Sequence, residues 1–212
     1  MADQSVFGEP ITQEVLMTIP EYANKVRMDR SVVSTQWIDK DGKEDDVTEY
    51  VRSLKEEWGT GVSTLCRVYN GTGERLTFHL SHDWLGHIYK TYPPVIENGQ
   101  WGGFLHVKPT GAAEGSEAAV VYRGKNKNGE DADWMLCWDN PWNRIPYDNK
   151  AYAEINRAGY FDNIDWKTIE DSMEGGGRQH TAKWEGCVAE VQTESDTSPI
   201  YEAKLYLSTQ DT

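Results

Sequence analysis

From Val62 onward, apolar and polar residues alternate in short stretches that are separated by Gly, Asn, Asp and Pro. A period of two indicates β-strands with one buried face, and the separating residues are those that turns favour. In one stretch, Leu76, Phe78 and Leu80 are expected to share a face. Short strands joined by tight turns restrict the chain to an antiparallel sandwich or barrel. The stretches cover residues 76–80, 101–107, 118–122, 134–138, 184–188 and 200–207.

Two helices are predicted ahead of the strands. A capping box begins a helix that runs from Thr18 to about Val33, with Ala23 near its apolar face. A second box precedes apolar residues at helical spacing over Val47–Trp58, and Gly59 ends that helix.

A third helix is predicted within the strand region, because the segment Asp162–Asp165 can cap an apolar pattern of helical spacing over Trp166–Met173 and three glycines follow. The only candidate domain boundary is Gly59–Gly61. The chain therefore divides into an N-terminal helical extension over residues 1–60 and a β-sandwich domain over residues 61–212.

The formal net charge of −14 argues against partners that carry many negative charges. It repels the phosphates of nucleic acids and opposes capture by anionic membranes, while zwitterionic or glycosylated lipids stay compatible. No signal peptide or transmembrane segment is visible, so we predict a cytoplasmic protein that can bind membranes peripherally. Cys66, Cys137 and Cys187 are too few and too widely spaced for a disulfide scaffold, and they are expected to be buried.

Nine tryptophans, most of them in short aromatic phrases, are the main indication of function. The phrases are His82–Trp84, Asn98–Gly102 and Trp134–Trp142. A tryptophan offers a broad apolar face and one N–H donor, which suits lipid headgroups, sugars and protein interfaces as well as cores. This density in a polar chain favours a recognition surface over an active site.

Several longer phrases follow one another through the strand region: Leu65–Asn70, Ser81–Trp84, Gly86–His87, Glu97–Gly102, Phe104–Lys108, Gly111–Ala113, Val120–Tyr122 and Trp138–Trp142. Together, over roughly residues 60–210, they resemble the jasmonate-induced protein family of plants. That family is similar to the nakanori-type lectin-like proteins, the aegerolysins and, more remotely, the actinoporins. The resemblance implies an actinoporin-like antiparallel β-sandwich with flanking N-terminal helices and one short helix in the C-terminal half. In the wider group, loops bind membrane sphingolipids, in some cases with sterol, and some members form pores.

The segment Trp138–Tyr147 is the first candidate site. Pro141 cannot continue a central strand, so Trp142 and Tyr147 are expected on a loop. Arg144 between them can contact a phosphate bidentately, while the aromatic rings can stack over a choline group. The alternative is that Trp142 closes the end of the sandwich and Arg144 pairs with an acidic neighbour.

The glycine-rich loop 97–103 around Trp101 is the second candidate, since glycines permit close approach of a ligand. The alternative is a hairpin turn that feeds a core strand and buries Trp101. Trp84 is a further aromatic candidate, beside His82, Asp83 and His87. These three are weak metal candidates: a zinc site needs three or four converging ligands, and their spacing favours histidines that hydrogen-bond strand ends. No cofactor is predicted.

The sequence contains no nucleophile elbow, phosphate-binding glycine loop or zinc-protease motif, which favours a non-enzymatic protein. We predict a jasmonate- and stress-responsive protein that binds a membrane sphingolipid headgroup or a related glycan through its aromatic loops. The first predicted helix has a narrow apolar face that Pro20 interrupts, which argues against pore formation. The alternatives are a lectin that uses the same tryptophans, an enzyme or metabolite binder with a pocket among Trp84, Trp101 and Trp138, and a homo-oligomer that buries the aromatic face.

Overall fold

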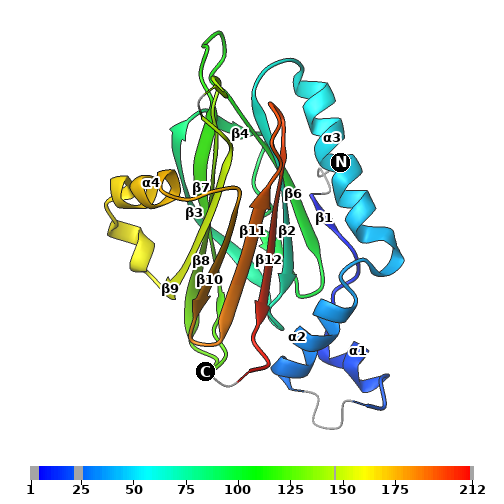
Figure 1. Cartoon of the computed structure of the whole chain (residues 1–212). Coiled ribbons are helices and arrows are strands. Elements are labelled where there is room, and N and C mark those ends of the chain that lie inside the picture. The colour runs from blue at the N-terminus through cyan, green and yellow to red at the C-terminus, as the bar shows by residue number, and fades with distance from the viewer. Residues whose placement is uncertain (1–4, 22–25, 146, 211–212) are drawn as a thin grey trace.

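Two β-sheets packed face to face form the body of the protein in a computed structural model that describes residues 5–21, 26–145 and 147–210 (Figure 1). The first sheet has the strand order β1-β6-β2-β12-β11-β10, with β4 also paired to β6. The second has the order β5-β3-β7-β8-β9. All neighbouring strands are antiparallel except β12 and β2, which run parallel.

The elements confirm the predicted mainly-β class. The first sheet consists of β1 (Val6–Phe7), β2 (Ser63–Gly71), β4 (His87–Tyr89), β6 (Trp101–Val107), β10 (Gln179–Trp184), β11 (Cys187–Thr193) and β12 (Ile200–Leu207). The second consists of β3 (Leu76–Leu85), β5 (Val95–Ile96), β7 (Ser116–Lys125), β8 (Asp131–Asn140) and β9 (Lys150–Arg157). The helices are α1 (Gln13–Met17), α2 (Arg27–Gln36), η1 (Lys40–Gly42), α3 (Lys43–Trp58), η2 (Tyr160–Asn163) and α4 (Trp166–Glu174).

The core between the sheets is built from alternate residues of each strand, as the period-two pattern predicts. Trp138 is fully buried there, and its ring lies 5.8 Å from that of Phe104 and 5.5 Å from that of Tyr201, centroid to centroid. Both partners belong to the first sheet, so this side chain joins the two layers. Its strand-mates Trp134 and Leu136 face the same core.

A helix covers each outer face. Val51 and Leu54 of α3 pack against Leu65 and Leu105 of the first sheet. On the second sheet, Ile169 and Met173 of α4 pack against the side chains of β7 and β8 that point away from the core, such as Val121 and Met135. Strands β7 and β8 are therefore buried on both faces, which explains why their sequences are almost continuously apolar.

A register shift between Phe78 and Leu80 corrects one predicted alternation. Leu76 and Phe78 pack in the core between the sheets, whereas Leu80 packs with the outer cluster beneath α4. A bulge inserts a residue without a partner and so reverses the direction of every following side chain. The prediction that all three share one face was wrong for this reason.

The N-terminal helices differ from their prediction at their starts. Thr18 was predicted to begin a helix, but it ends α1 instead. Its backbone N–H and its hydroxyl donate to carbonyl groups in the last turn of α1. The next helix, α2, begins at Arg27. Ala23 lies outside the described residues. Helix α3 starts at Lys43, four residues early, because Gly42 adopts a left-handed conformation (φ 75°) that turns the chain into it. Helix α4 lies where it was predicted; of the predicted capping segment Asp162–Asp165, Asp165 is the N-cap and Asp162 belongs to η2.

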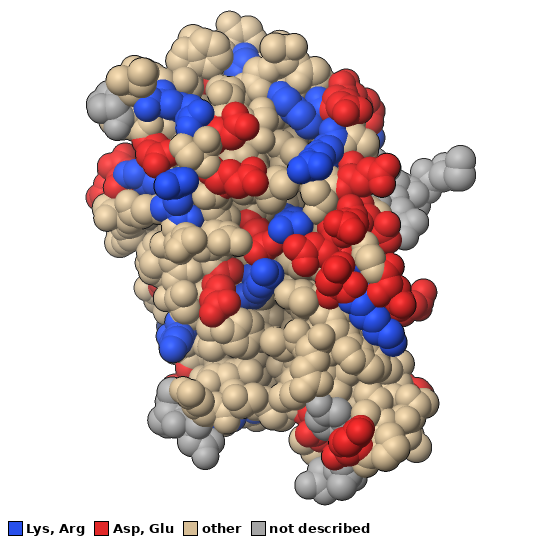
Figure 2. All heavy atoms as spheres, turned by 45° about the vertical axis from the view of Figure 1, so that its right-hand side comes forward, with Lys and Arg blue, Asp and Glu red and all other residues tan. Residues whose placement is uncertain are grey.

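The first 60 residues are closely associated with the sandwich. Strand β1 pairs with β6 and extends the first sheet. Acidic side chains gather on the side of the molecule that carries α3, whose first turn contains Glu44, Asp45 and Asp46 (Figure 2). Among the described residues, no helix is both long and apolar enough to cross a membrane. The division at residue 60 stays a prediction.

A pair of opposed carboxylates beneath α4 makes stability depend on pH. Glu117 and Asp139 face each other across β7 and β8. Burial, together with the negative charges of Asp139 and α4, raises the pKa of Glu117 to about 8. The folded state therefore binds more protons than the unfolded state between pH ~4.5 and ~8. The contribution of Glu117 to stability is therefore greatest at the acidic side of this range and is lost as pH rises through it.

Glu117→Gln is expected to raise the Tm at pH 8 and to have little effect at pH 4.5. One pKa unit corresponds to about 1.4 kcal/mol, and each 1 kcal/mol shifts the Tm of a chain this long by about 2–4 °C. Thermal unfolding followed by circular dichroism at both pH values measures the difference. Glu56→Gln, on the exposed face of α3, is the matched control. An equal effect of Glu117→Gln at both pH values would contradict this account.

Candidate functional site

The loop between β8 and β9, residues 141–149, carries the densest group of exposed bulky apolar side chains. Trp142 is 52% exposed, Ile145 84% and Tyr147 61%. The other exposed large apolar residues, such as Met17 and Tyr160, are scattered over the surface that the structure describes. The loop emerges at the end of the sandwich opposite α1 and α2 (Figure 1). Scattered apolar residues are normal on a protein surface, whereas a group on one loop marks an interaction site.

Two buried asparagines hold the ends of this loop in place. The side-chain amide of Asn140 donates to the carbonyl oxygens of Ser63 (3.0 Å) and Thr197 (3.1 Å). The amide of Asn149 donates to those of Glu194 (2.7 Å) and Asp196 (2.8 Å). Both hydrogens of each amide are thus used, and both ends of the 141–149 loop are fixed to the loop 194–199. The apolar tip is consequently displayed from an anchored base.

Arg144 is held by a chain of polar contacts at the same place. Its Nη2 donates to the Ser195 hydroxyl (2.6 Å), which donates to Asp148 Oδ1 (3.1 Å). The other oxygen of Asp148 lies 3.3 Å from Nε of Arg178. Asp148 is thus linked to Arg178 directly and to Arg144 through the Ser195 hydroxyl.

The Nε of Arg144 is buried and has no hydrogen-bond partner among the described residues. A buried donor without a partner costs about 1–3 kcal/mol and calls for a physical explanation. The buried Nε is closed to a ligand, so a phosphate group can reach only the part of Arg144 that is exposed. That side chain lies on the same loop as the exposed rings of Trp142 and Tyr147.

The structure separates the other predicted ligand residues from this loop. Trp101 and Trp138 are buried in the interior, where Trp101 Nε1 donates to the carbonyl of Ile38 (2.9 Å). Trp84 is half-buried on the outer face of the second sheet, edge-on to the rings of His82 and Trp166. Of the six candidates, Trp142, Arg144 and Tyr147 lie on the 141–149 loop, and the role of all six as ligand-binding residues stays a prediction.

The weak metal candidates are also kept apart. The His82 ring stacks on Trp166 with centroids 4.7 Å apart, whereas Asp83 Oδ1 lies 3.3 Å from Nε2 of His106. His87 is exposed at the start of β4. None of the three belongs to the cluster described next.

Among the described residues, His79, Asp133 and Asp162 form a group of suitable metal ligands, with the ligand atoms within 4.8 Å of one another. The guanidinium of Arg123 donates to both oxygens of Asp133, at 2.7 Å and 2.9 Å. The buried carboxylate of this cluster is thus already paired with a cation of the chain itself.

Several residues of the loop site escaped the sequence-based prediction. Ile145 is the most exposed apolar side chain of the loop. An isoleucine among Asn, Arg and Pro in a predicted loop could have indicated this exposed apolar position from the sequence. Ser195 and Arg178 come from segments far away in the sequence and could not be placed without the fold. The same is true of the partners of Asn140 and Asn149.

A helix-flanked antiparallel sandwich with an exposed aromatic loop at one end is the actinoporin-like architecture that the sequence predicts. The chain belongs to the Nakanori-like protein family, whose model matches residues 7–208. The crystal structure of the lipid-binding protein Nakanori superimposes with a TM-score of 0.85 at 28% identity, covering 95% of this chain and 99% of that chain.

Two plant proteins are similar in sequence. The 23 kDa jasmonate-induced protein of Hordeum vulgare is 40% identical over 164 residues, which is 75% of this chain and 76% of the relative. A jasmonate-induced protein homolog of Atriplex canescens is 36% identical over 116 residues, 54% of this chain and 62% of the relative. The predicted resemblance to the jasmonate-induced proteins is confirmed.

Asn149→Ala is expected to destabilise the protein by about 1–3 kcal/mol, because it leaves two carbonyl groups of the 194–199 loop without their donor. Urea unfolding, followed by tryptophan fluorescence, measures the loss. Asn163→Ala, at an exposed position in η2, should stay within about 0.5 kcal/mol of the wild type. Equal stability of the two variants would show that the anchor contributes little.

Proposed function

We propose that this protein binds the headgroup of a zwitterionic membrane lipid, a sphingolipid in particular, through the 141–149 loop. The observation that carries the proposal is the exposure of Trp142, Ile145 and Tyr147 on a loop anchored at both ends. In the bound state these side chains enter the membrane interface. Arg144 contacts the headgroup phosphate, and the aromatic rings lie against its choline.

The charge of the chain supports this mode of binding. A protein with a net charge of −14 gains nothing from long-range attraction to a membrane. Retention must then come from apolar insertion and from local headgroup contacts. Complete burial of one large apolar side chain contributes about 1.5–3 kcal/mol, so three such side chains together are sufficient for reversible binding.

The similarity to a structure described as a lipid-binding protein supports the lipid class, and the jasmonate-induced relatives support a role in that response. Binding without pore formation is supported by the docking of α3, since Val47, Val51 and Leu54 of its apolar face are buried against the first sheet. The described part of α3 therefore presents no free apolar face to a bilayer.

Trp142→Ala is expected to weaken retention on sphingomyelin-containing vesicles at least tenfold, because the loss of about 1.5–3 kcal/mol exceeds the 1.4 kcal/mol that corresponds to a factor of ten. Co-sedimentation with vesicles of phosphatidylcholine alone, and with vesicles that also carry sphingomyelin and sterol, measures it. Met17→Ala removes an apolar side chain at the opposite end that is more exposed than Trp142 (69% against 52%) and should leave retention unchanged.

The outcomes separate the candidate functions. Retention that depends on sphingomyelin and on Trp142 would support the proposal. No pelleting of the wild type on any of these vesicles would overturn it. Release of an entrapped dye by the wild type would contradict binding without pore formation.

A further inference from the structure

Three adjoining cavities lie on the outer face of the first sheet, over β10, β11 and β12. Their volumes are 260, 660 and 210 Å³. Glu190 lines all three, Thr181 lines the first two, and Tyr206 lines the last two. They share these lining residues, and α2 contributes to the second and third through Thr35; together they are here named the β10–β12 trough. The 141–149 loop takes no part in it.

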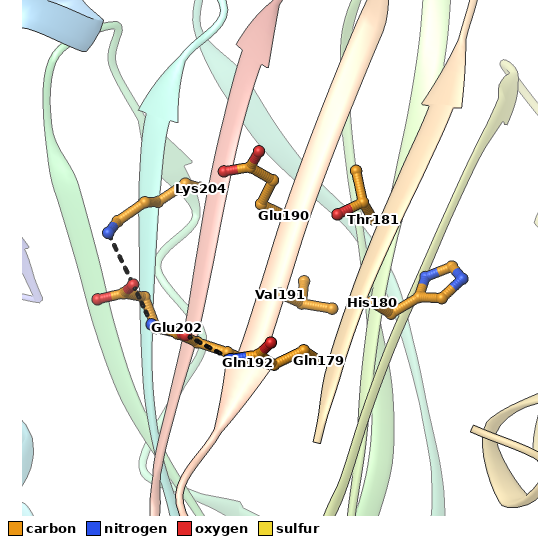
Figure 3. A pocket seen from close by; sticks show the side chains of 8 residues that line it. All are labelled: Gln179, His180, Thr181, Glu190, Val191, Gln192, Glu202 and Lys204. Atoms are coloured by element: carbon orange, nitrogen blue, oxygen red, sulfur yellow. Dashed lines mark hydrogen bonds and ion pairs between the residues drawn. The ribbon is translucent and has the colours of Figure 1, made fainter. Parts of the chain in front are cut away.

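The floor of the trough is a regular array of polar side chains. Residues directly opposite one another in the three antiparallel strands form rows across the sheet (Figure 3). Neighbouring groups are about 4.8 Å apart between strands and about 6.8 Å apart along them. The first row holds Thr181, Glu190 and Lys204, and the second holds Gln179, Gln192 and Glu202.

Part of this array is fixed by its own contacts. The buried carboxylate of Glu202 accepts from Gln192 Nε2 (2.9 Å) and Lys204 Nζ (2.8 Å) and also pairs with Arg67. Its acceptor sites are thus occupied by groups of the protein, and it holds the neighbouring donors in position.

Another part keeps hydrogen-bonding capacity for a ligand. Glu190 Oε1 accepts from the hydroxyl of Tyr206 (2.7 Å), which leaves its second oxygen. The Thr181 hydroxyl makes no hydrogen bond within the described residues. Lys204 has three donors, of which one is directed at Glu202. Donors and acceptors therefore alternate over a small area.

The charge of the trough is balanced, in contrast to the rest of the chain. The lining contains two carboxylates, Glu190 and Glu202, and two ammonium groups, Lys183 and Lys204. An anionic or a cationic ligand would gain little here. At one end, Tyr206 adjoins Tyr69 and Ile38, which gives that end an apolar wall.

From this combination we infer that the β10–β12 trough is a second binding site, for a neutral saccharide. Its hydroxyl groups bond to Thr181, Glu190 and Lys204, and the apolar face of one sugar ring lies against Tyr206. A free oligosaccharide and the sugar of a glycolipid offer this same chemistry. The site is independent of the lipid site proposed for the 141–149 loop.

A titration of the ¹⁵N-labelled protein with lactose, maltose, cellobiose and chitobiose in turn tests the inference. At millimolar concentration, at least one of them is expected to shift backbone amide signals of β10, β11 and β12. Thr181→Val and Glu190→Gln keep the side-chain shapes and are each expected to weaken binding at least tenfold. Glu56→Gln is the control. Trp142→Ala should leave the shifts intact, even if lipid binding fails.

Vesicles of phosphatidylcholine with glucosylceramide distinguish the two sources of the sugar. Retention that Glu190→Gln lowers would assign the site to a glycolipid, and binding of soluble disaccharides alone would assign it to free saccharides. The inference is overturned if none of the four disaccharides shifts these amides. It is equally overturned if the shifts appear at residues 141–149 or survive both trough variants unchanged.

Discussion

The packing of Trp138 between the sheets is the contact on which the candidate lipid site depends. Its ring lies against Phe104, His106 and Tyr201, all of them in the first sheet. Truncation of so large a core side chain costs about 3–5 kcal/mol. Two residues later the chain reaches Asn140, whose amide bonds set the direction of the 141–149 loop. The position of the exposed aromatic tip is thus determined from within the core.

Polar contacts also connect the two sheets. The Ser116 hydroxyl, on the second sheet, lies 2.8 Å from both Nδ1 of His106 and the Thr64 hydroxyl, on the first. All three residues are buried. Fully paired polar groups of this kind tolerate only one relative placement of the two layers, since a shift would leave a buried group without its partner. The relative placement of the two sheets is therefore fixed at the end of the sandwich that carries the loop.

The strands, and the class of fold, could be predicted from the sequence because burial on one face leaves a period of two in the residues. Trp142 and Tyr147 could be placed on a loop because Pro141 ends a strand. The burial of Trp101 is the alternative that the sequence left open for its loop, and Trp138 ends a predicted strand; the residue type alone does not decide between core and surface, since a tryptophan suits both. The reversal at Leu80 could not be foreseen, because a bulge depends on the partner strand. Ser195 and Arg178 reach the loop only through tertiary structure.

Cys66, Cys137 and Cys187 are all buried and unpaired, and burial raises the pKa of each thiol. The thiolate is the form that attacks an alkylating reagent, and here that form is both suppressed and shielded. The sandwich is therefore held together without a disulfide bond that reducing conditions could break. Cys66 and Cys187 lie between the sheets, whereas Cys137 lies beneath α4. The rate at which an alkylating reagent modifies Cys66 and Cys187 in the native protein therefore reports how often the sheets open, and modification of Cys137 reports the release of α4.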